Sequence, residues 1–315
     1  MKGKIVFMGT PDFAVGSLDA IVNAGYEVAA VVTVPDRQSG RGLKLTASPV
    51  KEYAIQHNLP VLQPEKMRDP EFLETLKAYN ADIFVVVAFR MLPKAVWAMP
   101  PMGTFNLHAS LLPQYRGAAP INHAIINGEK RSGVTTFLLN ENIDEGMLLM
   151  QKETAISDDD TAETLHDRLA SIGSTLVVET LDGLFNGTLK PYPQPMEEPL
   201  HPAPKIFKEN CAINWNLGGQ EIYNFVRGLS PYPAATATMT NGNGEQVYLK
   251  IFKTVYEKGP SNSLGKIISD QKKELKIEVK DGFIKILQLQ MSGKKKISVE
   301  EFLRGYNVSN WKLMI

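Results

Sequence analysis

The spacing of apolar residues divides the chain into two parts with different predicted secondary structure. Up to about residue 189, continuous apolar runs such as 5–8 and 82–88 alternate with stretches that repeat apolar residues at helical spacing. Continuous runs of this length are typical of strands buried on both faces of a parallel sheet. Beyond residue 205 the apolar segments are short and separated by turn signals, of which Asn241-Gly242 and Asp281-Gly282 are the clearest.

The two parts predict different folds. In the first part we expect strands over 5–8, 28–33, 82–88, 103–108, 133–140 and 147–154, and helices over 50–57, 70–79, 119–127 and 161–185. This order predicts an α/β, Rossmann-like, mostly parallel sheet with helices on both faces. In the second part we expect strands over 234–239, 246–255, 264–268, 274–279 and 283–289, with a helix over 220–227. Such a set predicts a small OB-like β-barrel.

A proline-rich stretch separates the two parts. Residues 190–204 hold six of the twenty prolines, which is typical of a semi-rigid extended linker. We therefore predict a catalytic domain over 1–189, a linker over 190–204 and a second domain over 205–315. The formal net charge of +0 hides a contrast, because residues 1–189 carry 16 basic and 22 acidic residues whereas residues 205–315 carry 17 and 10. A basic module of this kind favours a polyanionic partner.

The cysteine count and hydropathy narrow the possible classes of protein. The single cysteine excludes an internal disulfide and a cysteine-based metal cluster, and the chain contains no metal-ligand spacing. We found no signal peptide and no apolar run of membrane-spanning length. A cytoplasmic protein without a metal or a membrane partner is therefore expected.

The segment from Phe105 to Pro113 holds the candidate chemistry. Asn106 and His108 lie two residues apart on a predicted strand, so their side chains point to the same face. They lie at its carboxyl end, where open α/β sheets bind their ligands. An amide can donate to a developing oxyanion, and an imidazole can move a proton near neutral pH. The alternative is that Asn106 fixes a turn and His108 is a buried histidine with satisfied hydrogen bonds.

The first strand and turn argue against a dinucleotide site. Gly9 is followed by Thr10 and Pro11, so the glycine fingerprint of nicotinamide-binding folds is absent. A dehydrogenase is therefore disfavoured, although the fold is Rossmann-like.

A longer motif connects the chain to a known family. Asn106-Leu107-His108-Ala109-Ser110-Leu111-Leu112-Pro113, then 115–120 (Tyr-Arg-Gly-Ala-Ala-Pro) and 142–146 (Asn-Ile-Asp-Glu-Gly), resemble the folate-dependent formyltransferases, and most closely those that act on methionyl-tRNA. The resemblance runs from the first strand into the C-terminal third. It departs at Glu145, where many members have a small hydroxyl residue, and at Met147, where many have an acid.

The resemblance implies roles for particular residues. It implies that Asp144 faces Asn106 and His108 as the third catalytic residue, whereas taken alone Asp144 could be a turn residue. It implies that the folate is held by two segments of four residues each, namely Phe89, Arg90, Met91 and Leu92, and Ser110, Leu111, Leu112 and Pro113. Taken alone, the first of these segments is more often ordinary core.

A basic segment before the second predicted helix is a candidate for nucleic-acid binding. We expect residues 34–49 to form a long loop, and such loops are usually functional or disordered. It contains Arg37, Arg41 and Lys44 against one acid, Asp36. In the family, a basic insertion at this place reaches the tRNA acceptor end, which makes these three residues the expected tRNA contacts. The alternative is a solvated connection.

The implied reaction moves a formyl group from 10-formyltetrahydrofolate to the α-amine of initiator methionyl-tRNA, by an enzyme expected to be a monomer. Two alternatives remain open. A sister formyltransferase acts on a purine-pathway amine or a nucleotide sugar, but such enzymes resemble residues 1–189 and lack the basic loop followed by a basic barrel. A pure RNA-binding module on an inactive scaffold would not need Asn106, His108 and Asp144.

Overall fold

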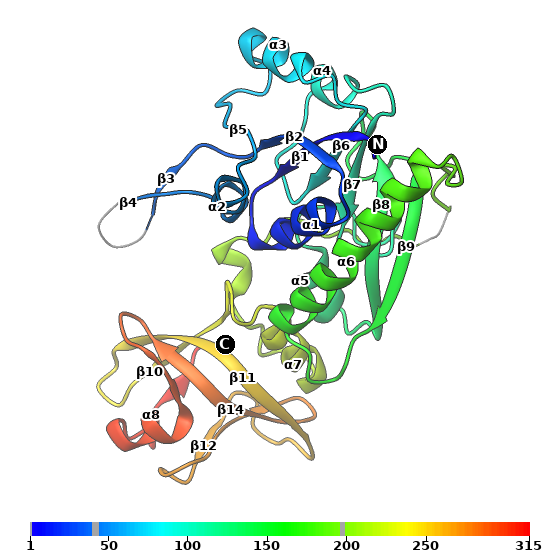
Figure 1. Cartoon of the computed structure of the whole chain (residues 1–315). Coiled ribbons are helices and arrows are strands. Elements are labelled where there is room, and N and C mark those ends of the chain that lie inside the picture. Colours follow the sequence, from blue (N-terminus) through cyan, green and yellow to red (C-terminus); the bar gives the residue numbers. More distant parts are fainter. Residues whose placement is uncertain (1, 40–43, 196–198) are drawn as a thin grey trace. The chain divides into compact units, whose positions relative to one another are not determined.

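The computed structural model describes residues 2–39, 44–195 and 199–315, which fold into two compact units (Figure 1). Unit 1 comprises residues 1–117, 132–154 and 166–202, and unit 2 comprises 118–131, 155–165 and 203–315. Unit 1 is built on a mostly parallel sheet and unit 2 on an antiparallel sheet. The predicted fold class is thus confirmed.

Seven strands form the sheet of unit 1, in the order β5-β2-β1-β6-β7-β8-β9. The bounds are β1 Lys4–Gly9, β2 Glu27–Val32, β5 Val61–Leu62, β6 Ile83–Val87, β7 Thr104–His108, β8 Arg131–Leu138 and β9 Leu148–Ala155. Neighbours from β5 to β7 are parallel, whereas β8 runs antiparallel to β7. β1 and β6 are buried along nearly their whole length, as their continuous apolar runs predict.

Helices cover both faces of this sheet, as predicted. They are α1 Asp12–Asn23, α2 Pro49–Gln56, α3 Pro70–Ala78, α4 Lys94–Trp97 and α6 Ala162–Phe185. On one face Val6 and Met8 of β1 share a core with Phe72 of α3 and Val96 of α4. On the other face α6 packs against β8, where the buried hydroxyls of Thr136 and Thr180 are 2.8 Å apart. In Figure 1 α1 lies beside α6, and α3 and α4 lie beyond the opposite face.

The prediction of an unstructured loop over 34–49 is wrong in part. Within it, β3 (Arg37–Ser39) and β4 (Lys44–Thr46) pair antiparallel as a short ribbon. Its base is anchored by Asp36, whose carboxylate accepts from Lys51 Nζ at 2.7 Å and from Gln63 Nε2 at 2.8 Å. The ribbon buries no apolar face, so backbone hydrogen bonds hold it together without leaving an alternating pattern in the sequence.

Unit 2 is a nearly closed antiparallel barrel with three short α-helices. Its strands are β10 Ala235–Thr240, β11 Gln246–Lys258, β12 Ile267–Ser269, β13 Leu275–Val279, β14 Gly282–Met291, β15 Lys296–Ser298 and β16 Lys312–Leu313. Its helices are α5 Pro120–Ile126, α7 Gly219–Gly228 and α8 Val299–Gly305, with a 3₁₀ turn over Lys208–Cys211. Trp215, Ile251, Ile286 and Phe302 lie in its core. β15, α8 and β16 were not predicted, because each is too short to show a hydrophobic period.

Two segments that precede the barrel in the sequence, residues 118–131 and 155–165, complete unit 2. α5 packs against α7, and Asn122 Nδ2 donates to the carbonyl oxygen of Gly228 at 2.7 Å. Arg227 is buried and its Nη1 donates to the carbonyl oxygens of Ser157 and Asp160 at 3.2 and 3.0 Å. The core of unit 2 therefore depends on residues far from it in sequence.

No helix in the described ranges has both the length and the apolar character of a membrane span.

Candidate active site

β7 presents Asn106 and His108 side by side on one face of the sheet. Leu107, between them, points to the opposite face, where it meets the backbone of α6 at Gly173. The carboxyl end of β7 is flanked by β6, where Val87 pairs with Leu107, and by β8, where Thr135 pairs with His108. The amide of Asn106 is partly exposed and has no hydrogen-bond partner among the described residues. It is therefore available to a bound molecule.

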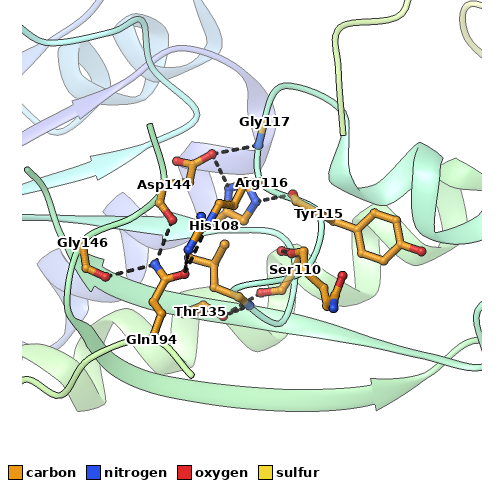
Figure 2. A network of polar contacts seen from close by, with 11 residues as sticks. His108, Ser110, Tyr115, Arg116, Gly117, Thr135, Asp144, Gly146 and Gln194 are labelled. Carbon is orange, nitrogen blue, oxygen red and sulfur yellow. Dashed lines mark hydrogen bonds and ion pairs between the residues drawn. The ribbon is translucent and has the colours of Figure 1, made fainter. Parts of the chain in front are cut away.

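His108 is held between a carbonyl and a carboxylate (Figure 2). Its Nε2 is 2.9 Å from the carbonyl oxygen of Tyr115, and its Nδ1 is 3.8 Å from Oδ2 of Asp144. A carbonyl oxygen only accepts, so Nε2 carries a hydrogen in both protonation states. Nδ1 is the ring nitrogen that makes no hydrogen bond to the backbone of the described residues. It lies beside a carboxylate, on a residue only 6% exposed to solvent.

Asp144 lies on the loop between β8 and β9, with a left-handed φ of 55° that aspartate tolerates better than most residues. Its Oδ2 accepts a hydrogen bond from the backbone N–H of Gly117 at 2.9 Å. Further along, a Cβ on Gly146 would lie 1.6 Å from the carbonyl oxygen of Leu138. The loop thus lies tightly against the end of β8, which fixes where the carboxylate can reach.

The segment that follows β7 is organised by hydroxyl groups. Thr135 Oγ1 donates to the carbonyl of Ser110 at 2.6 Å and accepts from the backbone N–H of Leu112 at 3.1 Å. Ser110 Oγ donates to the carbonyl of Gln114 at 2.6 Å. The chain then turns through Tyr115, with a φ of 60°, and its N–H donates to the carbonyl of His201 at 2.7 Å. These contacts aim the Tyr115 carbonyl at His108.

The two segments expected to hold folate differ in exposure. Ser110 and Leu112 are 1% and 2% exposed, and Pro113 is also buried, whereas Leu111 is partly exposed. Residues 89–92 follow β6, after Ala88 turns the chain with a φ of 48°. Their backbone groups make no hydrogen bonds to other described residues. In this segment Met91 is 74% exposed and Leu92 is buried.

Arg90 joins this segment to the residues that follow β5. Its Nη1 donates to the carbonyl of Glu65 at 3.0 Å, and its Nη2 donates to that of Pro64. Partial burial lowers the pKa of Arg90, and the charge of Arg37 lowers it further. Arg37 of β3 is exposed and Lys44 belongs to β4, whereas Arg41 lies outside the described residues. The structure thus places Arg37 near Arg90.

Three contributors to the site were missed by sequence analysis. The carbonyl of Tyr115 and the N–H of Gly117 are main-chain groups, which any residue supplies, so residue type gives no signal. Gln194 lies in the stretch predicted as a linker, yet its side chain contacts the Asp144 loop (Figure 2). The only feature of the sequence that could have indicated its role is that Gln194 is a polar residue between two prolines. No cluster of three or more His, Cys, Asp or Glu side chains in the described parts of the chain is arranged to hold a metal ion.

His108 lies beside the Asp144 carboxylate, and the Asn106 amide, unpaired among the described residues, is next to it at the carboxyl end of the sheet; the chemistry of these groups suits acyl transfer. Comparison with known proteins specifies the class: the chain belongs to the formyl transferase family, whose model matches residues 3–181, while the model of the formyl transferase C-terminal domain matches residues 205–307. The chain is therefore a transferase enzyme, and the resemblance seen in the sequence is confirmed.

The curated relatives narrow this class further. The methionyl-tRNA formyltransferase of Bacteroides thetaiotaomicron is 50% identical over 312 residues, which cover 98% of this chain and 97% of that protein. The methionyl-tRNA formyltransferase of Flavobacterium johnsoniae is 51% identical over 310 residues, covering 98% of each. The solved N-formyltransferase of Helicobacter canadensis, in complex with folinic acid and dTDP-3-aminofucose, matches with a TM-score of 0.66 at 22% identity, covering 94% of this chain and 100% of that one. At that identity it supports the fold alone.

Proposed function

We propose that the enzyme transfers the formyl group of 10-formyltetrahydrofolate to the α-amine of initiator methionyl-tRNA. The observation that carries the proposal is His108 fixed between the Tyr115 carbonyl and the Asp144 carboxylate, with Asn106 free beside it. Relatives about half identical over nearly the whole length are methionyl-tRNA formyltransferases. Translation initiates in the cytoplasm, so we place the reaction there. We also propose that the enzyme is a monomer.

Asn106 and His108 have complementary roles in this proposal. The amine attacks the formyl carbon, a C–N bond forms, and negative charge develops on the formyl oxygen. The Asn106 amide can donate to that oxygen, and a protonated His108 can donate from Nδ1. Neither group has to break an internal hydrogen bond first, because Asn106 has no partner among the described residues and Nδ1 lies 3.8 Å from Asp144.

Asp144 completes the proton balance. The attacking amine must lose a proton after it bonds to the formyl carbon, and the nitrogen of the departing folate must gain one. Asp144, directly or through a water molecule, accepts the first proton, and His108 Nδ1 delivers the second. The Tyr115 carbonyl keeps Nε2 protonated throughout, so Nδ1 is the only ring nitrogen that exchanges a proton with the substrates.

The backbone after β6 is suited to a folate. Residues 89–92 leave N–H and C=O groups unbonded next to the carboxyl end of β7, and the edge of a pterin ring presents matching donors and acceptors. We assign pterin binding to this backbone and to the turn over 110–113, where buried side chains fix the main chain. 10-Formyltetrahydrofolate supplies the formyl carbon, and no step requires a metal or a covalent enzyme adduct.

Two basic regions are proposed to bind the tRNA. Arg37 and Lys44 belong to β3 and β4 of the ribbon, and Arg41 stands between them in the sequence. In unit 2, Lys294, Lys295 and Lys296 are exposed, and none of the three has an acidic partner among the described residues. Lys296 Nζ lies 5.1 Å from the centre of the Phe252 ring. We assign catalysis to residues 1–189 and tRNA binding to 205–315, joined by 190–204.

One assay tests the proposal. The purified chain is given 10-formyltetrahydrofolate with charged initiator tRNA, free methionine, glycinamide ribonucleotide or an amino-sugar nucleotide. We expect fast formylation of the charged tRNA alone. Preferred turnover of either nucleotide would replace the proposal with a sister formyltransferase, and absence of turnover with every acceptor would leave only RNA binding.

A further inference from the structure

Gln194 lies outside the predicted catalytic domain, yet its side chain joins the two loops that flank His108 (Figure 2). Its Nε2 donates to the carbonyl oxygens of Asp144 and Gly146 at 2.8 and 3.0 Å. Its Oε1 accepts from Nη2 and Nε of Arg116 at 2.6 and 3.2 Å. Both hydrogens and the carbonyl oxygen of this amide are thus used, which a surface glutamine rarely achieves.

The groups at the two ends of this bridge are the ones that hold His108. Asp144, on one loop, faces Nδ1, whereas Tyr115 and Gly117, on the other, bond Nε2 and the Asp144 carboxylate. Arg116 lies between Tyr115 and Gly117 in sequence. A shift of one loop relative to the other would change the distance from the carboxylate to Nδ1. Gln194 joins the two loops, in addition to the direct contacts between Arg116 and Glu145 and between Gly117 and Asp144.

The backbone around Gln194 is itself fixed. Tyr192, two residues earlier, exchanges two hydrogen bonds with Leu148 at the start of β9, at 2.8 and 3.0 Å. Pro193 and Pro195 restrict the chain on either side of Gln194. Arg116 is oriented in addition by Glu145, whose carboxylate accepts from Nη1 at 3.0 Å. The bridge is therefore built on restrained groups.

From this geometry we propose that Gln194 is a positioning residue that sets the Asp144 carboxylate against His108. The inference deepens the proposed function and rests on it. It extends the catalytic apparatus into the proline-rich stretch that follows α6. Asp144 has a left-handed backbone, and the two carbonyls that Gln194 binds lie on either side of residue 145, so the amide clamps the turn that carries the carboxylate.

Two substitutions separate this role from simple pairing with Arg116. Gln194→Ala removes the whole bridge. Gln194→Glu keeps an acceptor for Arg116 but loses both donors and brings a carboxylate against two carbonyl oxygens. We expect both variants to lower kcat by about 10- to 100-fold, because a displacement near 1 Å at a reacting group costs up to this much. The KM for the formyl donor should change by less than about twofold, because the lost interactions act after binding.

The matched control is Tyr192→Ala, in the same stretch. The side chain of Tyr192 is 43% exposed and its pairing with Leu148 uses only backbone atoms, so kcat should stay at the wild-type value. Thermal unfolding of each variant checks that the protein is folded. If Gln194→Ala proves unfolded, Gln194→Glu, which keeps the volume of the side chain, carries the test.

A double-mutant cycle gives the decisive measurement. In an Asp144→Ala background, the further change Gln194→Ala should lower kcat by no more than about twofold, because the group that it positions is gone. A purely structural role would give the full loss again and would overturn the inference, as would wild-type kcat in both Gln194 variants. Failure of the proposed function looks different, since the wild-type chain itself would then not formylate methionyl-tRNA.

Discussion

Asn106 and His108 are neighbours in one motif, but their replacement should have different effects. We expect Asn106→Ala to lower kcat with little change in stability, and His108→Ala to lower both kcat and stability. Asn106→Ala removes a partly exposed amide that has no hydrogen-bond partner among the described residues. No buried group is left unsatisfied, so the free energy of unfolding should change by no more than about 0.5 kcal/mol. Loss of one donor to a developing oxyanion should lower kcat by about 10²–10³, equivalent to about 2.7–4 kcal/mol.

His108→Ala should cost stability as well as activity. His108 is 6% exposed, and its removal deletes the hydrogen bond between Nε2 and the Tyr115 carbonyl. Removing one partner of a buried hydrogen bond costs about 1–3 kcal/mol, and each kcal/mol corresponds to a fall in Tm of about 2–4 °C in a domain of this size.

The assay combines thermal unfolding with steady-state formylation of charged initiator tRNA. Asn106→Asp is measured beside Asn106→Ala as a second variant that keeps the volume of the side chain. Its added carboxylate should also lower kcat, because it opposes negative charge on the formyl oxygen. The reasoning fails if Asn106→Ala lowers Tm as much as His108→Ala, or if folded Asn106→Ala keeps kcat within about tenfold of wild type.

Three further predictions concern other parts of the chain. Arg37→Ala and Arg41→Ala should each raise the KM for charged tRNA and leave formyl-donor affinity nearly unchanged, measured by titration of each substrate; an equal loss of donor affinity would instead place the ribbon at the folate. Replacing Lys294, Lys295 and Lys296 by Gln in the full chain should flatten the dependence of log affinity for tRNA on log salt by about 0.7–0.9 for each phosphate that is no longer neutralised, and an unchanged slope would show that these lysines are only solvated. Backbone N–H groups of residues 272–274 hold the pKa of Asp270 at about 2. The ionised carboxylate therefore stabilises the fold above the ordinary pKa of an aspartate, and this stabilisation is lost as the pH falls toward 2. Asp270→Asn should make the unfolding temperature less dependent on pH between the ordinary pKa and pH 2, and a pH profile equal to that of the wild type would contradict this prediction.

The sheet of unit 1 was predictable because burial on both faces leaves a strong signal. β1 and β6 are continuous apolar runs. α2 and α3 each begin with a proline that follows a capping residue, and the caps Ser48 and Asp69 accept from backbone N–H groups of the first turn. The ribbon of β3 and β4 buries nothing, so its pairing had no such signal. β15 and β16 span three and two residues, which is below the length at which alternation can be recognised.

The candidate site shows the same limit at the level of atoms. Asn106 and His108 were named from the sequence because their side chains supply the chemistry, and Asp144 because of the family resemblance. The roles of all three remain predictions. The Tyr115 carbonyl contributes as a backbone atom, so only its position matters. Gln194 is separated from Asp144 by a strand and a long helix, and the proline content around it indicates a spacer. Only the fold brings it to the loop it bridges.

The alternation of the two units along the sequence has a consequence for dissection of the enzyme. Each unit is assembled from three segments, so the backbone passes between them five times. A cut after residue 204 would leave α5 and residues 155–165 on the N-terminal fragment, although they complete the core around α7. Separately expressed halves should then behave as fragments that complement one another: each poorly folded alone, and able to restore activity when mixed. The barrel is thus not a transferable module, and a chimaera that exchanges it between relatives must exchange these two inserted segments with it.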